Sequence, residues 1–192
     1  MKEIYLIRHA ETVMNKEMRF SGILDCELSE QGYEQLKQLK QKMQEYDIQQ
    51  CYCSPLKRAY LTAKSFFDNP VKVENLHEMN FGDIDGMKFT DVEKNFPSLA
   101  RDMLSEKREF EFPNGESREQ LRKRATQAYN DILAKDTNDS IAIVSHSCVI
   151  RAIISQEMVG DYSFSWKIQI GNCSITKLQK YSNNTILNFL NR

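Results

Sequence analysis

Three short runs of mainly apolar residues stand out along the chain, each followed by polar residues. They cover residues 3–8, 50–54 and 141–145. Apolar runs of this length, bounded by turn signals and rich in β-branched or aromatic types, predict buried strands. Residues 71–73 predict a further short strand.

Between these runs, apolar residues recur three or four positions apart, which is the spacing of a helix with one buried face. Two of the helix starts carry residues typical of an N-terminal cap, including one Ser-x-x-Gln capping box. Helices are expected from Ser29 to Met43, over about 56–67, from Ser117 and Gln120 through Leu133, and over 149–158.

The C-terminal part returns to a strand-like alternation. Apolar residues from Phe164 to Ile170 alternate with polar ones, and Gly171-Asn172 is expected to turn the chain into another strand. Strands that alternate with helices form a parallel sheet covered on both faces. We therefore expect a single α/β domain over 1–192, a three-layer α/β/α sandwich with a mostly parallel central sheet. The irregular segment 77–116 is expected to cap one end of it.

Composition narrows the classes of function. The chain has 192 residues, of which 26 are Lys or Arg and 27 are Asp or Glu, and 41% are hydrophobic. This balanced charge argues against nucleic acid or an anionic membrane surface as the main partner, and no apolar run approaches the roughly 20 residues of a membrane span. Five scattered cysteines without a Cys-x-x-Cys pair argue against zinc and against a disulfide framework. We expect a cytoplasmic protein with reduced thiols.

Two of the three histidines occupy the same kind of position. His9 and His146 each directly follow a predicted buried strand, and the carboxyl ends of parallel strands meet at the edge where ligands bind. Arg8 precedes the first histidine, and Arg58 lies near the start of the helix that follows the 50–54 strand. Guanidinium groups and helix N-termini bind phosphate, so a pocket for a phosphorylated ligand is predicted here.

A structural role and a metal site are the competing interpretations of these histidines. A single histidine at a strand end is often a hydrogen-bonded structural residue, although two at matching positions are less easily explained in this way. A metal site would need a third ligand at a zinc-like spacing, and the adjacent arginines would repel a cation. His77, the third histidine, lies in the irregular segment and is expected at the surface.

The residues around His9 resemble the signature of the histidine phosphatase superfamily, the phosphoglycerate mutase-like proteins. Further segments similar to this family follow in the family's order over nearly the whole chain, which is far more specific than one motif. The segments are Leu6-Ile7-Arg8-His9-Ala10-Glu11-Thr12, Arg19-Phe20-Ser21-Gly22, Ser54-Pro55-Leu56-Lys57-Arg58-Ala59, Leu76-His77-Glu78, Pro113-Asn114-Gly115-Glu116-Ser117 and Val144-Ser145-His146.

The resemblance implies a metal-independent enzyme, without a cofactor, that forms a phosphohistidine. It makes His9 the nucleophile and Glu78 the proton donor to the leaving oxygen. Arg8, Arg58 and His146 would hold the phosphoryl oxygens. Further contacts to the substrate would come from Asn15, Ser21, Gly22 and Ser147.

The chain departs from the family pattern at a few positions. Ser147 and Cys148 stand where relatives usually have glycines, and the backbone N–H groups remain available for phosphate unless the turn needs a positive φ. His77 stands where arginine is common. Cys51 and Cys53 share one face of a strand and are expected to pack in the core.

Three functions are compatible with the resemblance. The chain is short and lacks an obvious equivalent of the inserted segment with which bisphosphoglycerate-dependent phosphoglycerate mutases exclude water, which favours a phosphatase. The pattern from Glu78 to Gly86 resembles the α-ribazole phosphatase branch, so α-ribazole phosphate is one candidate among small phosphomonoesters. A non-catalytic phosphate-binding module is disfavoured, since such proteins should lose His9, Glu78 or a pocket arginine.

The sequence leaves open the role of the cations in the irregular segment and the oligomeric state. The cations of the irregular segment could meet a second anionic group of the substrate, but a solvated face is favoured. The oligomeric state, a homodimer included, cannot be derived from the sequence. The cations concerned are Lys88, Arg101, Lys107 and Arg108.

Overall fold

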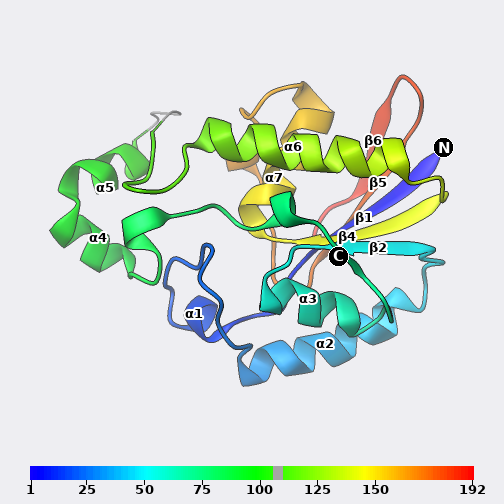
Figure 1. Cartoon of the computed structure of the whole chain (residues 1–192), viewed down its shortest axis with the longest axis horizontal. Helices are drawn as coiled ribbons and strands as arrows, with labels where there is room; N and C mark the ends of the chain where they lie inside the picture. The colour runs from blue at the N-terminus through cyan, green and yellow to red at the C-terminus, as the bar shows by residue number, and fades with distance from the viewer. Residues whose placement is uncertain (106–109) are drawn as a thin grey trace.

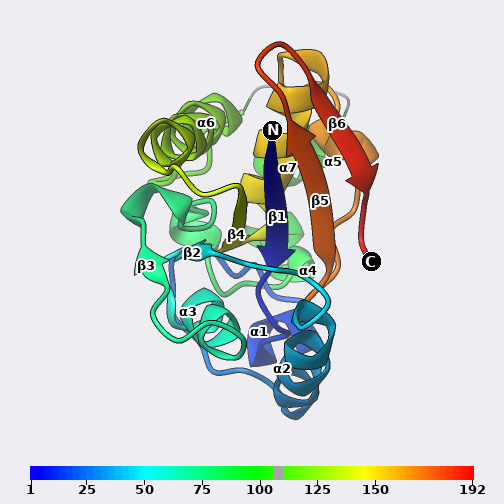
Figure 2. The same ribbon diagram turned by 90° about the vertical axis from the view of Figure 1, so that its right-hand side faces the viewer.

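The structure is a computed structural model that describes residues 1–105 and 110–192. In these ranges six strands form one sheet, in the order β3-β2-β4-β1-β5-β6 (Figures 1 and 2). Strands β1 to β4 run parallel to one another, and β5 and β6 are antiparallel to their neighbours, which confirms the mostly parallel α/β sheet. The bounds are β1 Lys2–Arg8, β2 Gln50–Cys53, β3 Val71–Lys72, β4 Ser140–Ser145, β5 Ile175–Lys180 and β6 Thr185–Phe189.

Helices cover both faces of the sheet (Figure 1). On one face lie α2 and α3, and on the other lie α6 and α7. The expected caps are present, because Ser29 Oγ accepts the Gly32 N–H and Ser117 Oγ accepts the Gln120 N–H. The helices are α1 Val13–Lys16, α2 Glu30–Met43, α3 Lys57–Lys64, α4 Phe89–Asn95, α5 Pro97–Leu104, α6 Arg118–Lys135 and α7 Ser147–Val159, with 3₁₀ turns at Glu74–Leu76, Gly82–Ile84 and Ser165–Lys167.

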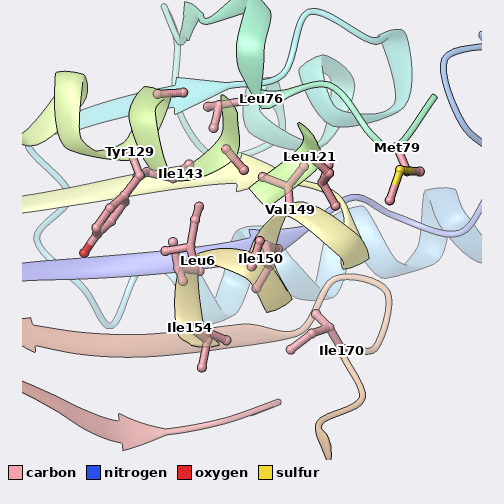
Figure 3. Packing of buried hydrophobic residues seen from close by; sticks show 14 of the residues in the cluster. Leu6, Leu76, Met79, Leu121, Tyr129, Ile143, Val149, Ile150, Ile154 and Ile170 are labelled. Carbon is pink, nitrogen blue, oxygen red and sulfur yellow. The ribbon is translucent and has the colours of Figure 1, made fainter. Parts of the chain in front are cut away.

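The core consists of two apolar layers separated by the sheet. In β1, Leu6 packs with the α6 and α7 layer, whereas Ile7 packs with the α2 and α3 layer, as the alternation of side chains along a strand requires. Figure 3 shows the first of these layers. Every residue of β4 is buried, which explains its continuous apolar run. Cys51 and Cys53 are fully buried in the second layer, as expected.

The strand predicted over 164–170 is wrong. This segment forms a 3₁₀ turn at Ser165–Lys167 and irregular chain, because the free edge of β1 is occupied by β5. Ile168 and Ile170 are buried against the core and have no strand partner within the described ranges, and Trp166 remains 46% exposed. The helix expected over about 56–67 ends earlier, at Lys64.

The described parts of the segment 77–116, which are residues 77–105 and 110–116, carry α4 and α5 and lie beyond the carboxyl end of β1 (Figure 1). Lys88 and Arg101 are exposed, in agreement with a solvated face, whereas Lys107 and Arg108 lie outside the described residues. None of the helices in the described ranges combines the length and hydrophobicity that crossing a membrane requires.

Candidate active site

The sheet places His9 and His146 side by side. Arg8 at the end of β1 pairs with Ser145 at the end of β4, and the next residue of each strand is a histidine. The His9 N–H donates to the Ser145 carbonyl oxygen at 2.9 Å, and the two ring centroids lie 5.0 Å apart. Both side chains are almost entirely buried. The structure therefore brings together the two histidines that the sequence placed at strand ends.

The His9 ring is held in one tautomer. Its Nδ1 lies 2.7 Å from the Ala10 carbonyl oxygen, and since a carbonyl can only accept, Nδ1 carries the hydrogen. Burial, followed by the positive charges of Arg58 and Arg8, lowers the pKa of His9 well below its ordinary value of 6.5. The ring is therefore neutral near pH 7, with a lone pair on Nε2. A neutral imidazole of this kind can act as a nucleophile.

The His146 ring uses only one of its nitrogens within the protein. Nε2 lies 2.8 Å from Ser54 Oγ, whereas Nδ1 is buried and has no hydrogen-bond partner among the described residues. Burial, followed by the charge of Arg58, lowers the pKa of His146 well below 6.5. A second neutral imidazole thus lies beside His9.

Arg58, in the first turn of α3, is fully buried although it is charged. Its Nη1 donates to the Leu24 carbonyl oxygen at 3.0 Å, and its Nη2 donates to the carbonyl oxygens of Ser21 and Gly22. These bonds orient the guanidinium group, while its Nε is buried and has no partner in the described ranges. The loop that contains Ser21 and Gly22 therefore holds Arg58 in place.

The backbone N–H of Gly22 is already used within the protein, because it donates to Asp85 Oδ1 at 2.7 Å. It is therefore not available for the substrate contact that was expected of Gly22. A Cβ at this residue would lie 2.5 Å from the Met79 carbonyl oxygen, which only glycine avoids. Ser21 Oγ lies 3.7 Å from Cys26 Sγ.

Arg8 completes the charged part of the site. Its Nη1 donates to the Ile170 carbonyl oxygen at 2.6 Å, and its Nε is buried with no partner in the part of the chain that the structure describes. Together with the Nε of Arg58 and the Nδ1 of His146, this makes three buried nitrogens that find no acceptor among the described residues. All three belong to side chains near His9, since the charges of both arginines act on its pKa and the His146 ring lies beside it. Buried donors without partners cost free energy, and two of these belong to cations, so the set suits an anion. Among the described residues, no group of three metal-ligating side chains occurs.

Asn15 is oriented by a residue that the sequence reasoning missed. Asn15 Oδ1 accepts the Thr12 N–H at 3.1 Å and Asn172 Nδ2 at 3.3 Å, which leaves its NH₂ as the group that can donate to a ligand. Asn172 Nδ2 also donates to the His9 carbonyl oxygen at 3.0 Å. The sequence marked Asn172 only as part of a turn, and no local signal places it beside His9.

Glu78 lies in the loop after the Glu74–Leu76 turn, with its side chain against the first turn of α7, and is only 5% exposed. Its Oε1 accepts the Met79 N–H at 2.9 Å, and its Oε2 lies 3.4 Å from the Cys148 N–H. Ser147 and Cys148 are the first residues of α7 and have no positive φ, so replacing the usual glycines causes no left-handed strain. The N–H groups of a first helical turn have no partner within the helix, and that of Ser147 is therefore available to an anion.

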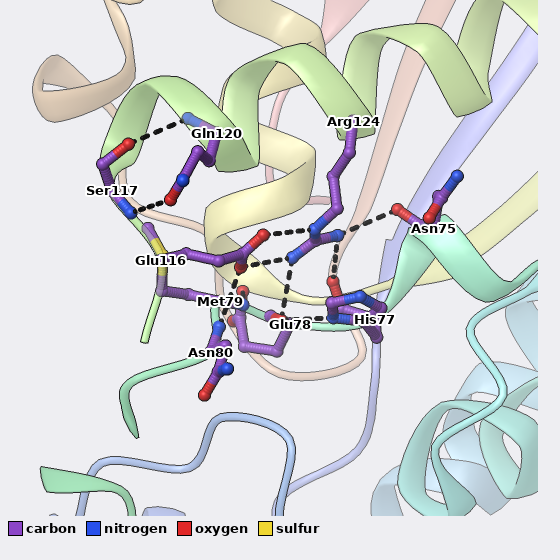
Figure 4. Close-up of polar contacts among 9 residues, drawn as sticks. All are labelled: Asn75, His77, Glu78, Met79, Asn80, Glu116, Ser117, Gln120 and Arg124. Atoms are coloured by element: carbon purple, nitrogen blue, oxygen red, sulfur yellow. Dashed lines mark hydrogen bonds and ion pairs between the residues drawn. The ribbon is translucent and has the colours of Figure 1, made fainter. Parts of the chain in front are cut away.

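The loop that carries Glu78 is fastened to α6 by Arg124 (Figure 4). The Arg124 guanidinium group donates to the carbonyl oxygens of Asn75, His77 and Glu78 at 2.8 to 3.0 Å, and it pairs with Glu116 at 2.6 Å. The sequence did not indicate a special role for Arg124, because a cation on the polar face of a helix is usually a solvent-exposed residue without a specific role.

His77 is half-buried rather than at the surface, which corrects the expectation from the sequence. Its carbonyl is held by Arg124, and its Nδ1 lies 2.8 Å from the Glu78 carbonyl oxygen. The same network continues to Asn80, whose N–H donates to Glu116 Oε2 at 2.9 Å. The backbone on both sides of Glu78 is therefore restrained.

Comparison with known proteins extends these observations. The model of the histidine phosphatase superfamily (branch 1) matches residues 4–192. Phosphoserine phosphatase 1 of Hydrogenobacter thermophilus is 29% identical over 195 residues, which cover 100% of this chain and 92% of that protein. Phosphoglycerate mutase-like protein 4 of Arabidopsis thaliana is 32% identical over 158 residues, which cover 79% of this chain and 69% of that protein.

Solved structures with the same fold include two phosphatases. A mutant of phosphoserine phosphatase from Entamoeba histolytica, in complex with phosphoserine, is 27% identical with a TM-score of 0.85, covering 100% of this chain and 97% of that one. The α-ribazole phosphatase from Shigella flexneri is 22% identical with a TM-score of 0.91, covering 99% and 96%. At this lower identity the second likeness concerns the fold alone.

Proposed function

This chain belongs to the histidine phosphatase superfamily and is a phosphatase, and we propose that it hydrolyses small phosphomonoesters without a metal, through a phosphohistidine at His9. One observation supports this proposal above all. Near the neutral His9, three buried nitrogens of Arg8, Arg58 and His146 have no acceptor in the described part of the chain. They match the need of a phosphoryl group for charge-assisted donors around its oxygens.

In the first half-reaction, the lone pair of His9 Nε2 forms a bond to phosphorus while the bond from phosphorus to the leaving oxygen breaks. The leaving oxygen receives a proton from the Glu78 carboxyl group, which releases an alcohol rather than an alkoxide. Arg8, Arg58 and the Nδ1–H of His146 stabilise the charge on the other phosphoryl oxygens. The Asn15 amide and the Ser147 N–H add donors. The carbonyl oxygens of Ser21 and Gly22 accept hydrogen bonds from Arg58 and so hold its guanidinium group in place.

In the second half-reaction, a water molecule attacks phosphorus and gives a proton to the Glu78 carboxylate. The bond from phosphorus to His9 Nε2 breaks, and the electron pair returns to the ring. Inorganic phosphate leaves, and both side chains regain their starting protonation states. Splitting one difficult displacement into two is the advantage of a covalent intermediate.

The relatives of this chain suggest which phosphomonoester to test first. Relatives named phosphoserine phosphatase match this chain at 29% and 27% identity over its whole length, whereas the α-ribazole phosphatase matches at 22%. Phosphoserine therefore comes before α-ribazole phosphate in a panel that also includes sugar phosphates and 3-phosphoglycerate. Interconversion of phosphoglycerates on addition of bisphosphoglycerate, in place of phosphate release, would identify a mutase instead.

The covalent step can be tested by rapid quenching with a ³²P-labelled phosphomonoester. We expect a labelled enzyme that is stable in base and labile in acid, and no label in the His9→Ala variant. His77→Ala is the matched control and should still be labelled, since the His77 ring contacts the Glu78 carbonyl oxygen and not His9 in the described hydrogen bonds. Label retained by His9→Ala would reject the assigned nucleophile.

A further inference from the structure

We propose that Ser54 sets the tautomer of His146, so that His146 Nδ1–H is presented as a hydrogen-bond donor to the phosphoryl group. Ser54 is then a positioning residue that acts through His146. The inference rests on the proposed function for its kinetic consequence, although the tautomer itself can be observed without turnover.

The hydrogen bonds around Ser54 carry the argument. The residue follows β2, is fully buried and is tied to β4 through its N–H, which donates to the Val144 carbonyl oxygen at 2.9 Å. Its Oγ accepts the Leu56 N–H at 3.3 Å and lies 2.8 Å from His146 Nε2. Among the hydrogen bonds of the described residues, His146 Nε2 is the only acceptor for the hydrogen of the Ser54 hydroxyl.

Only one arrangement satisfies every group. If Ser54 O–H donates to His146 Nε2, the hydroxyl uses its hydrogen and its oxygen remains an acceptor for the Leu56 N–H. If Nε2 carried the hydrogen instead, Ser54 Oγ would accept two N–H groups and its own hydrogen would be buried without an acceptor. A buried donor without a partner costs about 1–3 kcal/mol, so the first arrangement is favoured.

The tautomer decides what the other side of the ring offers. A neutral imidazole has one hydrogen, and with Nε2 accepting, that hydrogen is on Nδ1. Nδ1 is buried and has no hydrogen-bond partner in the described ranges, and the ring lies 5.0 Å from that of His9. An Nδ1–H attracts a phosphoryl oxygen, whereas the lone pair of the opposite tautomer would repel it.

A second serine provides the comparison that separates this role from simple packing. Ser145 is also fully buried, and it immediately precedes His146. Its Oγ donates to the Leu76 carbonyl oxygen at 2.7 Å and makes no hydrogen bond to a histidine ring in the described part of the chain. Ser145→Ala therefore removes a buried hydroxyl next to His146 in the sequence without removing a hydrogen bond to the His146 ring.

The direct test is a long-range ¹H–¹⁵N correlation spectrum of the ¹⁵N-histidine-labelled full chain at pH 7.5, without substrate. We expect His146, identified by its loss in His146→Gln, to show a protonated Nδ1 and an unprotonated Nε2. Ser54→Ala should shift the ring toward a protonated Nε2, Ser54→Thr should restore the original pattern, and Ser145→Ala should leave it unchanged. A protonated Nε2 in the unaltered protein, or no change in Ser54→Ala, would overturn the inference.

The kinetic test uses single-turnover phosphorylation by p-nitrophenyl phosphate. Losing one preorganised donor to a transition-state oxyanion costs roughly 10²–10³-fold in rate, and we expect Ser54→Ala to lose about 10²-fold. In a His146→Gln background, the same change should have little further effect, because Ser54 acts through His146. Equal losses in both backgrounds would overturn the inference. Absence of any turnover in the unaltered protein would instead reject the proposed function, and the spectra would still decide the tautomer.

Discussion

Acidification from pH 7.5 to pH 5.5 is expected to destabilise the protein through two residues. His9 and His146 are buried and neutral, and burial with the charge of Arg58 lowers the pKa of each well below 6.5. In the unfolded chain, both return to a pKa of about 6.5. Because the folded pKa is the lower one, the unfolded chain binds protons first as the pH falls. The stabilisation is therefore complete above pH 6.5 and is lost below it.

The magnitude follows from this difference in proton binding. A histidine that stays neutral in the folded protein and titrates near pH 6.5 when unfolded loses about 1.4 kcal/mol between pH 7.5 and pH 5.5. The two histidines together lose about 2.7 kcal/mol, which is a large part of the 5–15 kcal/mol typical of a domain. Carboxyl groups with lowered pKa values, such as Glu116, titrate below this window, and thiols with raised values, such as Cys51, titrate above it.

The assay is urea unfolding at pH 7.5, 6.5 and 5.5 in phosphate-free buffer, followed by circular dichroism. The quantity compared is the change in unfolding free energy with pH within each variant, so that the structural cost of the substitution cancels. His9→Gln and His146→Gln should each lose only about 1.4 kcal/mol, and the double variant close to none. His77→Gln is the control and should lose about as much as the unaltered protein.

Two results would refute the reasoning. One is an unaltered protein that is as stable at pH 5.5 as at pH 7.5, since two buried neutral histidines cannot produce this. The other is a double variant that loses as much stability as the unaltered protein, which would assign the acid sensitivity to other groups.

Three further predictions concern metal, proton transfer and packing. Phosphatase activity should survive EDTA, and activity lost on chelation and restored by magnesium or zinc would contradict the proposal. Glu78→Gln should slow single-turnover phosphorylation by phosphoserine about 10²-fold. It should slow phosphorylation by p-nitrophenyl phosphate less than about tenfold, because p-nitrophenolate needs no proton to leave. Equal losses for the two substrates would exclude Glu78 as the acid. Gly32→Ala should cost about 1–3 kcal/mol in urea unfolding, because its Cβ would lie 2.1 Å from the Glu11 carbonyl oxygen. Gly171→Ala, with nothing closer than 3.8 Å, should change stability by less than about 0.5 kcal/mol, and equal effects of the two changes would refute the steric argument.

The sequence alone determined the main strands, because a strand buried on both faces needs a continuous apolar run and such runs are local. It also determined that His9 and His146 follow such runs, and from this their neighbourhood at one sheet edge could be predicted. The caps at Ser29 and Ser117 were likewise predictable, since a capping side chain bonds to the backbone three residues away.

Tertiary structure alone decided which partners each polar group has. Ser54 and His146 are 92 residues apart, and Asn172 and His9 are 163 apart, yet both pairs are hydrogen-bonded because of the strand order β2-β4-β1-β5. In the same order β5 occupies the free edge of β1, and residues 164–170 have no strand partner among the residues that the structure describes, although their alternation was strand-like. Local patterns encode which face of an element is buried, but not which element will lie beside it. The orientation of the donors around His9 is set by those neighbours, and it could not be derived before the sheet was assembled.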